Sequence, residues 1–348
     1  MKKFLPLFLP LLVILPAYIS CGSGDDPASP DDPRSFTISY GYLFLNKDKS
    51  FDLSVKDYPA GATLEWTSSN ESIVSVKDGK VTAHKKEGEA LVSVTVKGSS
   101  LYNAQCIVRV VPEDWLTIGC GAIHMVDVEG GTFMMGEDKR QRENPDPQMQ
   151  ANIVHEVTLS SYRMSDSEIT LGLWESVMNP DTPKNAFIGE NAYYPVTNKT
   201  YKEITAFINQ LNVLTGRNFR LPTEAQWEYA ARGGNATNDY LYSGSDLLFQ
   251  VGVYYDNADL TDFYRINLLY PNELGIYDLS GGVNELCSDY YGEYPSVSVT
   301  DPIGPKEGTS RVVRGGSYIS SAEECTVFHR TYMPEDQGAQ TLGFRLVE

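Results

Sequence analysis

The residues most able to do chemistry gather in one short segment, VVRGGSYISSAEECTVFHR, at 312–330. Ser317 follows a Gly-Gly pair, Ser320 comes next, and Cys325 lies five residues beyond Ser320. A cysteine attacks a substrate or binds a soft metal as its thiolate, which requires a cationic neighbour that lowers the thiol pKa. His329 and the arginine after it are close enough in sequence to supply one. The segment therefore contains one candidate nucleophile, Cys325.

Other chemistries find little support. The four histidines, at 84, 124, 155 and 329, are scattered without the spacing of a zinc site. The chain has no phosphate-binding loop, no HExxH motif and no nucleophile elbow. Its net charge of −18, from 46 acidic and 28 basic residues, repels phosphate backbones and argues against nucleic-acid binding. Such a charge favours solubility, and attraction for cations is the alternative.

The N-terminus has the pattern of an export signal. Two lysines precede the apolar run FLPLFLPLLVILPAYI, whose three prolines make it a poor permanent membrane helix. Residues 1–20 are therefore predicted to be a signal peptide. Cys21 directly after the run resembles the lipobox of bacterial lipoproteins, which implies cleavage before Cys21 and attachment of a lipid to it. An ordinary cleaved signal is the alternative.

Residues 21–35 are rich in Asp, Pro and Ser and are predicted to be a disordered tether. Acidic residues just after the cysteine also resemble the surface-export signals of some lipoproteins. We therefore expect a protein that is lipid-anchored at the outer membrane or cell surface; whether it faces the periplasm or the outside is left open.

Residues 36–112 have the period-two alternation of half-buried strands, as in SFDLSV and ALVSVTV. Asp78-Gly79 is predicted to be a hairpin turn, and the whole to be a small all-β sandwich. The segment LEWTSSNESIVSVKDGKVTAHKKEGEALVSVTV resembles the group 2 bacterial immunoglobulin-like domain, through Trp66, Ser68-Ser69-Asn70, the Val76–Gly79–Val81 hairpin and Gly88. That resemblance implies a spacer or adhesion module without catalysis.

Three helices are expected farther along the chain. TYKEITAFINQLNVLTG begins with a capping box, Thr200 with Glu203, and ends at Gly216. LPTEAQWEYAARGG repeats this logic with Thr223 and Gln226, and a shorter helix is predicted around ITLGLWESVM.

Several phrases in order resemble the formylglycine-generating enzyme (sulfatase-modifying factor) family. They are VEGGTFMMG, HEVTLSSYRMSDSEIT, RLPTEAQWEYAARGG, PNELGIYDLSGGVNELCSD, RVVRGGSY and the terminal LGFRLV. The resemblance implies that residues 120–348 form an α+β domain with the C-type-lectin-like fold of that family. It also implies relatedness to an oxidase in which two cysteine thiolates bind copper(I), the soft ion that such ligands suit.

The copper-binding pair is missing from this sequence. Counting forward from the Gly-Gly-Ser turn, Ser320 occupies the place of the first copper cysteine and Cys325 that of the second. Counting backward from Arg330, Cys325 matches a structural cysteine of relatives. Neither count yields two thiols, so copper is not expected. The family's tryptophan in N-x-W-E-W is Asn284 here, and Ser317, which remains, is more often structural in such a turn.

Three interpretations of Cys325 follow from the resemblance. The favoured one is a disulfide with Cys287, whose NELC replaces the family's WEWC; the others are a buried free thiol and a catalytic nucleophile. Outside the cytoplasm, Cys106, Cys120, Cys287 and Cys325 can form up to two disulfides.

The resemblance also implies a structural calcium ion. Its ligands would be the side chains of Asp278 and Glu285 and the carbonyls of Gly281 and Val283, which are the hard oxygen ligands that calcium needs. A solvated turn or a cap for the next segment is the alternative.

The function expected from the sequence is noncatalytic binding of a protein or glycan partner at the cell surface. One alternative is an oxidase that generates formylglycine from a sulfatase cysteine, against which Ser320 argues. Another is a structural subunit of a surface assembly.

Overall fold

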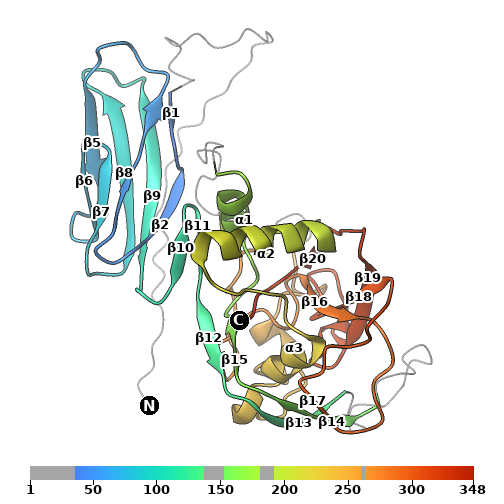
Figure 1. Cartoon of the computed structure of the whole chain (residues 1–348). Helices are drawn as coiled ribbons and strands as arrows, with labels where there is room; N and C mark the ends of the chain where they lie inside the picture. The colour runs from blue at the N-terminus through green and yellow to red at the C-terminus, as the bar shows by residue number, and fades with distance from the viewer. Residues whose placement is uncertain (1–35, 137–152, 181–191, 260–263) are drawn as a thin grey trace, which may run out of the picture.

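A computed structural model describes residues 36–136, 153–180, 192–259 and 264–348. The predicted signal, the tether and Cys21 lie outside these ranges. Figure 1 shows a strand-rich unit at one end of the molecule and a larger mixed unit beside it. The mixed α+β class expected from the sequence is confirmed. Of the residues described, no helix combines the length and apolar character that crossing a bilayer requires.

The first unit is a sandwich of two sheets. A four-stranded sheet has the order β2 (Tyr42–Asn46), β9 (Asn103–Val111), β8 (Gly88–Val96), β5 (Leu64–Ser68). A three-stranded sheet has the order β3 (Ser50–Asp52), β7 (Lys80–Ala83), β6 (Val74–Lys77). Short β1 (Thr37–Ile38) and β4 (Val55–Lys56) pair with each other. Apolar side chains of both sheets form one hydrophobic core.

The period-two pattern explains this core. Along β8, Ala90, Val92, Val94 and Val96 are buried, and the residues between them are half-buried. The predicted hairpin joins β6 to β7, and Asp78 and Gly79 both have positive φ, at 51° and 82°. A Cβ on Gly79 would lie 2.7 Å from a backbone oxygen, so this turn requires glycine.

The larger unit contains the three predicted helices. They are α1 (Leu171–Met178), α2 (Tyr201–Thr215) and α3 (Glu224–Ala231), followed by the short α4 (Leu248–Val251) and the 3₁₀ turns η4 (Gly234–Ala236) and η5 (Glu323–Cys325). Both predicted capping boxes form, on Thr200 with Glu203 and on Thr223 with Gln226. Gly216 ends α2 in the left-handed conformation.

Four small sheets complete this unit. The largest has the order β19 (Arg330–Pro334), β18 (Ser310–Arg314), β16 (Asn284–Tyr290), β20 (Leu342–Gly343). The others are β13 (Gly131–Met135), β14 (His155–Leu159), β17 (Val299–Thr300); β12 (Met125–Val128) with β15 (Tyr162–Ser165); and β10 (Leu116–Ile118) with β11 (Gly121–Ile123). α1 and α2 pack together through Trp174, whose ring stacks on Phe207 at 4.9 Å.

The two units contact each other near α1 (Figure 1). Tyr42 and Phe44 of β2 pack with Ala192 of the larger unit. Arg109 of β9 donates a hydrogen bond from Nη1 to the Tyr193 hydroxyl at 2.7 Å. In Figure 1 the sandwich lies nearer to α1 than to α3.

Candidate functional site

The Gly-Gly-Ser turn lies directly after β18 and rests on Cys325. Gly315 and Gly316 have φ of 95° and 72°, a conformation that favours glycine. A Cβ on Gly316 would lie 2.6 Å from the Cys325 Sγ atom and 2.8 Å from the Glu324 carbonyl oxygen. The two glycines therefore let the backbone close over the thiol.

Ser317 and Ser320 face each other inside this turn. Their Oγ atoms are 3.3 Å apart, and the Ser320 N–H donates to the Ser317 carbonyl at 2.8 Å. Both side chains are buried. Ser320 thus forms a hydrogen bond with Ser317.

Cys325 has the surroundings of an apolar core residue. Its side chain has no exposed surface and packs with Tyr242, Leu248 and Val251. Burial, and after it the negative charge of Glu324, raises the pKa of the Cys325 thiol to about 12. The thiol is therefore protonated at neutral pH, whereas a nucleophile or metal ligand must be a thiolate.

The two cations suggested by the sequence do not activate this thiol. Burial, and next the charge of Arg314, lowers the pKa of His329 to about 4, so the imidazole is neutral at physiological pH. Arg330 is buried and pairs with Glu224, with Nη2 and Oε2 2.7 Å apart. Neither residue supplies a free positive charge for Cys325.

The disulfide expected between Cys287 and Cys325 is not formed. Both are buried free thiols, and they lie in different hydrophobic clusters. Cys287 lies on β16, where its side chain joins the cluster that contains Trp227 of α3, and Cys325 joins the cluster of α4. The favoured prediction of a Cys287–Cys325 disulfide therefore differs from the structure. The alternative of a buried free thiol describes Cys325.

The expected calcium ligand Glu285 instead accepts hydrogen bonds from Arg345 and Trp227. Its Oε1 accepts from Arg345 Nη2 at 2.6 Å, and its Oε2 accepts from Arg345 Nε at 2.6 Å. The Trp227 indole N–H also donates to Oε2, at 2.7 Å. All three side chains are buried. Parallel pairing of β16 with β20 brings Arg345 to Glu285, and the guanidinium neutralises this carboxylate.

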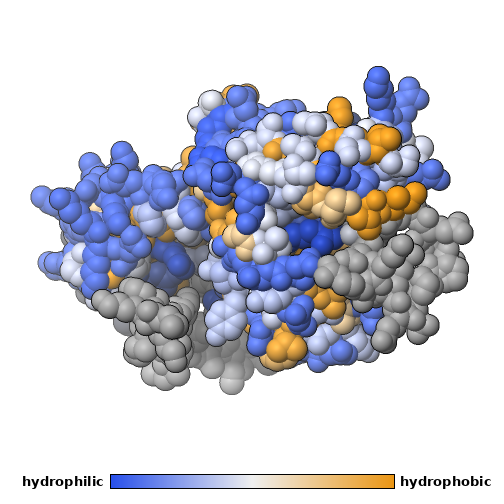
Figure 2. Space-filling model, turned by 90° about the horizontal axis from the view of Figure 1, so that it is seen from below, coloured by the Kyte–Doolittle hydropathy of each residue, from blue (hydrophilic) through white to orange (hydrophobic). Residues whose placement is uncertain are grey.

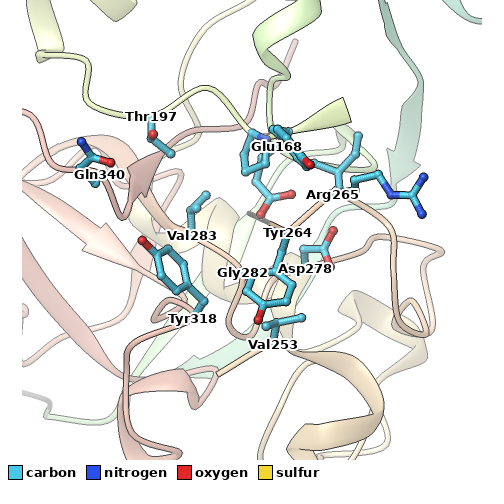
Figure 3. A pocket seen from close by; sticks show the side chains of 13 residues that line it. Glu168, Thr197, Val253, Tyr264, Arg265, Asp278, Gly282, Val283, Tyr318 and Gln340 are labelled. Carbon is cyan, nitrogen blue, oxygen red and sulfur yellow. The ribbon is translucent and has the colours of Figure 1, made fainter. Parts of the chain in front are cut away.

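Asp278 instead lines a small cavity of about 30 Å³. Gly282, Val283, Tyr318 and Glu168 also line it (Figure 3). The Asn267 N–H donates to Asp278 Oδ2 at 2.6 Å. Burial raises the pKa of Asp278 to about 6. Of the predicted calcium set, the structure therefore places the side chain of Asp278 and residue Val283 at the cavity.

Glu168 was not singled out from the sequence. It follows β15, is only 3% exposed, and its Oε2 has no hydrogen-bond partner among the described residues. Burial, followed by the charges of Asp278 and Glu285, raises the pKa of Glu168 well above its ordinary value. The only sign of Glu168 in the sequence is its position: it is an acidic residue shortly before the helix α1, whose side chains are mostly buried. Among the residues described, no group of three or more His, Cys, Asp or Glu side chains is arranged to hold a metal ion.

Four large apolar side chains are exposed on segments near the Gly-Gly-Ser turn. Phe249, Tyr255, Tyr270 and Ile319 are between 53% and 71% exposed. Backbone hydrogen bonds connect their segments: Tyr255 N–H donates to Ser320 O, and Tyr270 N–H donates to Gln250 O, each at 3.1 Å. We call these four residues the turn surface. Figure 2 shows groups of hydrophobic residues among hydrophilic ones on the lower face.

Comparisons with known proteins agree with this architecture. A family model described as sulfatase-modifying factor enzyme 1-like domain matches residues 121–348, and one described as bacterial Ig-like domain (group 2) matches residues 34–104. The formylglycine-generating enzyme of Streptomyces coelicolor is 35% identical over 173 residues, which cover 44% of this chain and 52% of that enzyme. Chaperone protein LppX of Paenibacillus barcinonensis is 27% identical over 63% of this chain and 88% of its own.

Among solved structures, Treponema denticola variable protein 1 has a TM-score of 0.58 and 26% identity, over 68% of this chain and 99% of that one. PvdO from Pseudomonas aeruginosa, at 21% identity and a TM-score of 0.52, shares the fold. The chain spans about half the length of the first curated relatives that it matches. C-terminal to its immunoglobulin-like sandwich, the chain belongs to the sulfatase-modifying factor enzyme 1-like family and has that family's C-type-lectin-like fold.

Proposed function

We propose that the larger unit is a noncatalytic binding module. The observation that carries this proposal is the chemistry at the turn, where one buried, protonated thiol stands beside a serine. A linear copper(I) site needs two soft thiolates. Ser320 offers a hard hydroxyl, and the Cys325 thiol has a pKa raised to about 12. The oxidase chemistry of the family therefore lacks its metal ligands in this chain.

The turn surface supports a protein as the partner. Contiguous exposed apolar side chains mark interaction sites on soluble proteins. Tyrosine and phenylalanine are enriched in the centres of protein–protein interfaces. Phe249, Tyr255, Tyr270 and Ile319 fit this composition. A glycan is the second class of partner, because tyrosine rings also pack on sugars, and the experiment below separates the two.

The proposal includes export and a lipid anchor on Cys21, supported by the apolar N-terminal run and the cysteine that follows it. Binding would then occur at the outer membrane or cell surface. Labelling of cells with a radioactive fatty acid tests the anchor. The full chain should take up label, and the Cys21→Ala chain should take up none. Equal labelling of both would contradict the anchor.

The binding proposal is tested by probing protein and glycan arrays from the cell surface with the full chain. Bound proteins should be lost with Tyr255→Ala and with Tyr270→Ala. Tyr332→Ala is the matched control, since this tyrosine of β19 is also 54% exposed but lies outside the turn surface. Binding to glycans alone would replace the protein partner by a sugar. Binding that neither variant alters would contradict the role of the turn surface.

An oxidase acting on a sulfatase cysteine is the second candidate, because the 35% identity is to a formylglycine-generating enzyme. This activity requires Cys325 as a thiolate, and burial of Cys325 disfavours the thiolate. Incubation of the chain with copper(I), oxygen and a peptide that contains the sulfatase recognition cysteine tests this activity.

A further inference from the structure

A groove of about 640 Å³ lies beside α2, and none of the four residues of the turn surface lines it. One wall is formed by α2, and another by residues 301–303, directly after β17. In Figure 1, α2 lies on one side of α3 and β17 on the other, so segments far apart in the sequence form these walls. A groove of this volume has the size of a ligand-binding cleft.

The groove follows α2 over two helical turns. Tyr201, Thr205, Ile208 and Asn209 line it, and they span about 12 Å along the helix axis. An extended peptide advances about 3.3 Å per residue, so about four residues match this length. The Asn209 side chain is exposed, and an amide can exchange hydrogen bonds with a peptide group. The shape of the groove therefore suits an extended chain better than a compact ligand.

Arg220 supplies a positive charge to the groove. Its Nη1 atom donates to Leu221 O at 3.1 Å and to Gln226 Oε1 at 2.8 Å, and both acceptors are neutral. Within the described ranges, no carboxylate lies at ion-pair distance from Arg220, and its Nε and Nη2 atoms donate no hydrogen bond. Burial lowers the pKa of Arg220, which indicates that nearby negative charges do not offset the water that this guanidinium has lost.

The two carboxylates that line this groove are bound by other residues. Asp301 accepts from the Ser160 N–H at 2.8 Å and from the Ser160 hydroxyl at 2.7 Å. Glu348 accepts from Arg217 Nε at 2.8 Å. An arginine binds a carboxylate best through two parallel N–H bonds. A carboxylate of a ligand would therefore give Arg220 the ion-pair partner that the described part of the chain does not supply.

Apolar surface lines the same groove. Ile303 is 72% exposed, although it is aliphatic, and Ile208 and Phe219 add buried apolar side chains to the lining. Asp301, two residues before Ile303, has a φ of 43°, which is uncommon for a residue other than glycine. Its hydrogen bonds to Ser160 restrain this backbone. A wall that is largely aliphatic suits amino-acid side chains, so it favours a peptide over a glycan.

We propose that this groove binds an extended acidic segment of a protein partner, with a carboxylate on Arg220 and a neighbouring apolar side chain against Ile303. The site goes beyond the proposed function, because it shares no residue with the turn surface. The net charge of −18 repels acidic partners at long range, but salt screens this repulsion beyond about 8 Å at physiological ionic strength. The local charge of Arg220 should therefore decide binding.

The test probes an array of acetylated and amidated pentapeptides with the full chain. Each peptide has a central aspartate or glutamate between aliphatic residues, and a matched peptide has asparagine or glutamine in its place. Wild type should bind acidic peptides and not their matched amides. Arg220→Gln should bind them about tenfold more weakly. Arg220→Lys should lie between the two, because lysine keeps the charge but lacks the planar fork.

Two further variants separate the groove from folding and from general charge. Ile303→Ser should weaken binding about threefold, because it removes apolar contact at an exposed position where the fold tolerates change. Lys202→Gln is the matched control, since it removes an exposed positive charge from α2 but does not line the groove. It should bind as wild type does. Tyr255→Ala should also keep peptide binding, which distinguishes this site from the turn surface.

Equal binding of wild type to acidic peptides and to their matched amides would overturn the proposal. So would wild-type affinity in an Arg220→Gln chain that is folded by circular dichroism, or an equal loss in Lys202→Gln. Binding of free isovalerate as tightly as the peptides would replace the protein segment by a small organic acid and would likewise contradict it.

Discussion

Cys325 lies directly beneath Gly316, so close that a Cβ atom on this glycine would fall 2.6 Å from the Cys325 Sγ atom. Backbone thereby covers one side of the thiol, and the side chains of its apolar cluster pack against it as well. This contact places Cys325 in a packed corner of the core. Substitution of Gly316 should therefore disturb this packing.

Gly316→Ala should lower the free energy of unfolding by roughly 3 kcal/mol, because it adds a steric clash to an unfavourable positive φ. Gly216→Ala is the control, since Gly216 has a similar φ of 69° and open space around it. It should cost only about 1 kcal/mol. Denaturant unfolding measures both. Equal losses would show that the Cys325 contact does not matter.

The Cys325 thiol should resist alkylation in the folded protein. Its pKa is raised to about 12, and its side chain has no exposed surface. Iodoacetamide at pH 8 should therefore modify Cys325 only after denaturation, as judged by peptide mass spectrometry. Cys287, equally buried, should behave in the same way. Rapid modification of native Cys325 would argue for a reactive thiol, and a cross-linked Cys287–Cys325 peptide would argue against free thiols.

Asp289 should make stability fall as pH rises. Burial, and then the charge of Glu224, raises the pKa of Asp289 to about 7 in the folded state, above its ordinary value of 3.8. The folded protein therefore binds the proton more tightly than the unfolded chain does. Its contribution is fully present below about pH 4 and is lost as pH rises toward 7, by at most roughly 4 kcal/mol.

Asp289→Asn should flatten this part of the stability curve, since an amide keeps the oxygen that accepts the Glu224 backbone N–H and does not titrate. Chemical unfolding of both chains between pH 4 and pH 8 provides the comparison. Parallel curves for the two proteins would contradict the shifted pKa of Asp289.

The buried pair of Glu285 and Arg345 should be strongly coupled. Arg345→Met leaves a carboxylate in the core without its cation and should cost roughly 3–5 kcal/mol. Adding Glu285→Gln to that variant removes the uncompensated charge and should recover part of the loss. A double-mutant cycle from equilibrium unfolding gives the coupling energy. Additive effects would show that the two side chains do not act as a pair.

Local features of the fold followed from the sequence because local rules decide them. The capping boxes at Thr200 and Thr223, the left-handed Gly216 and the Asp78-Gly79 turn depend on a few adjacent residues. The alternation along β8 likewise predicted which side chains enter the core.

The site depends on contacts between segments far apart in the chain, which no local pattern reports. Glu285 meets Arg345 only because β16 pairs with β20. Glu168 and Asp278 share a cavity although 110 positions separate them in the sequence. Cys287 and Cys325 were expected to bond because the family brings their segments together, but in the structure their side chains belong to separate clusters.

A noncatalytic domain of this family should not generate formylglycine, and an activity assay measures this. The full chain is incubated with copper(I), oxygen and a peptide that contains the sulfatase recognition cysteine, with the Streptomyces coelicolor formylglycine-generating enzyme as positive control. Mass spectrometry should show the peptide thiol unchanged by this chain and converted by the control enzyme. Conversion of the thiol to an aldehyde by this chain, and its loss in Cys325→Ala, would contradict the noncatalytic function proposed for the domain.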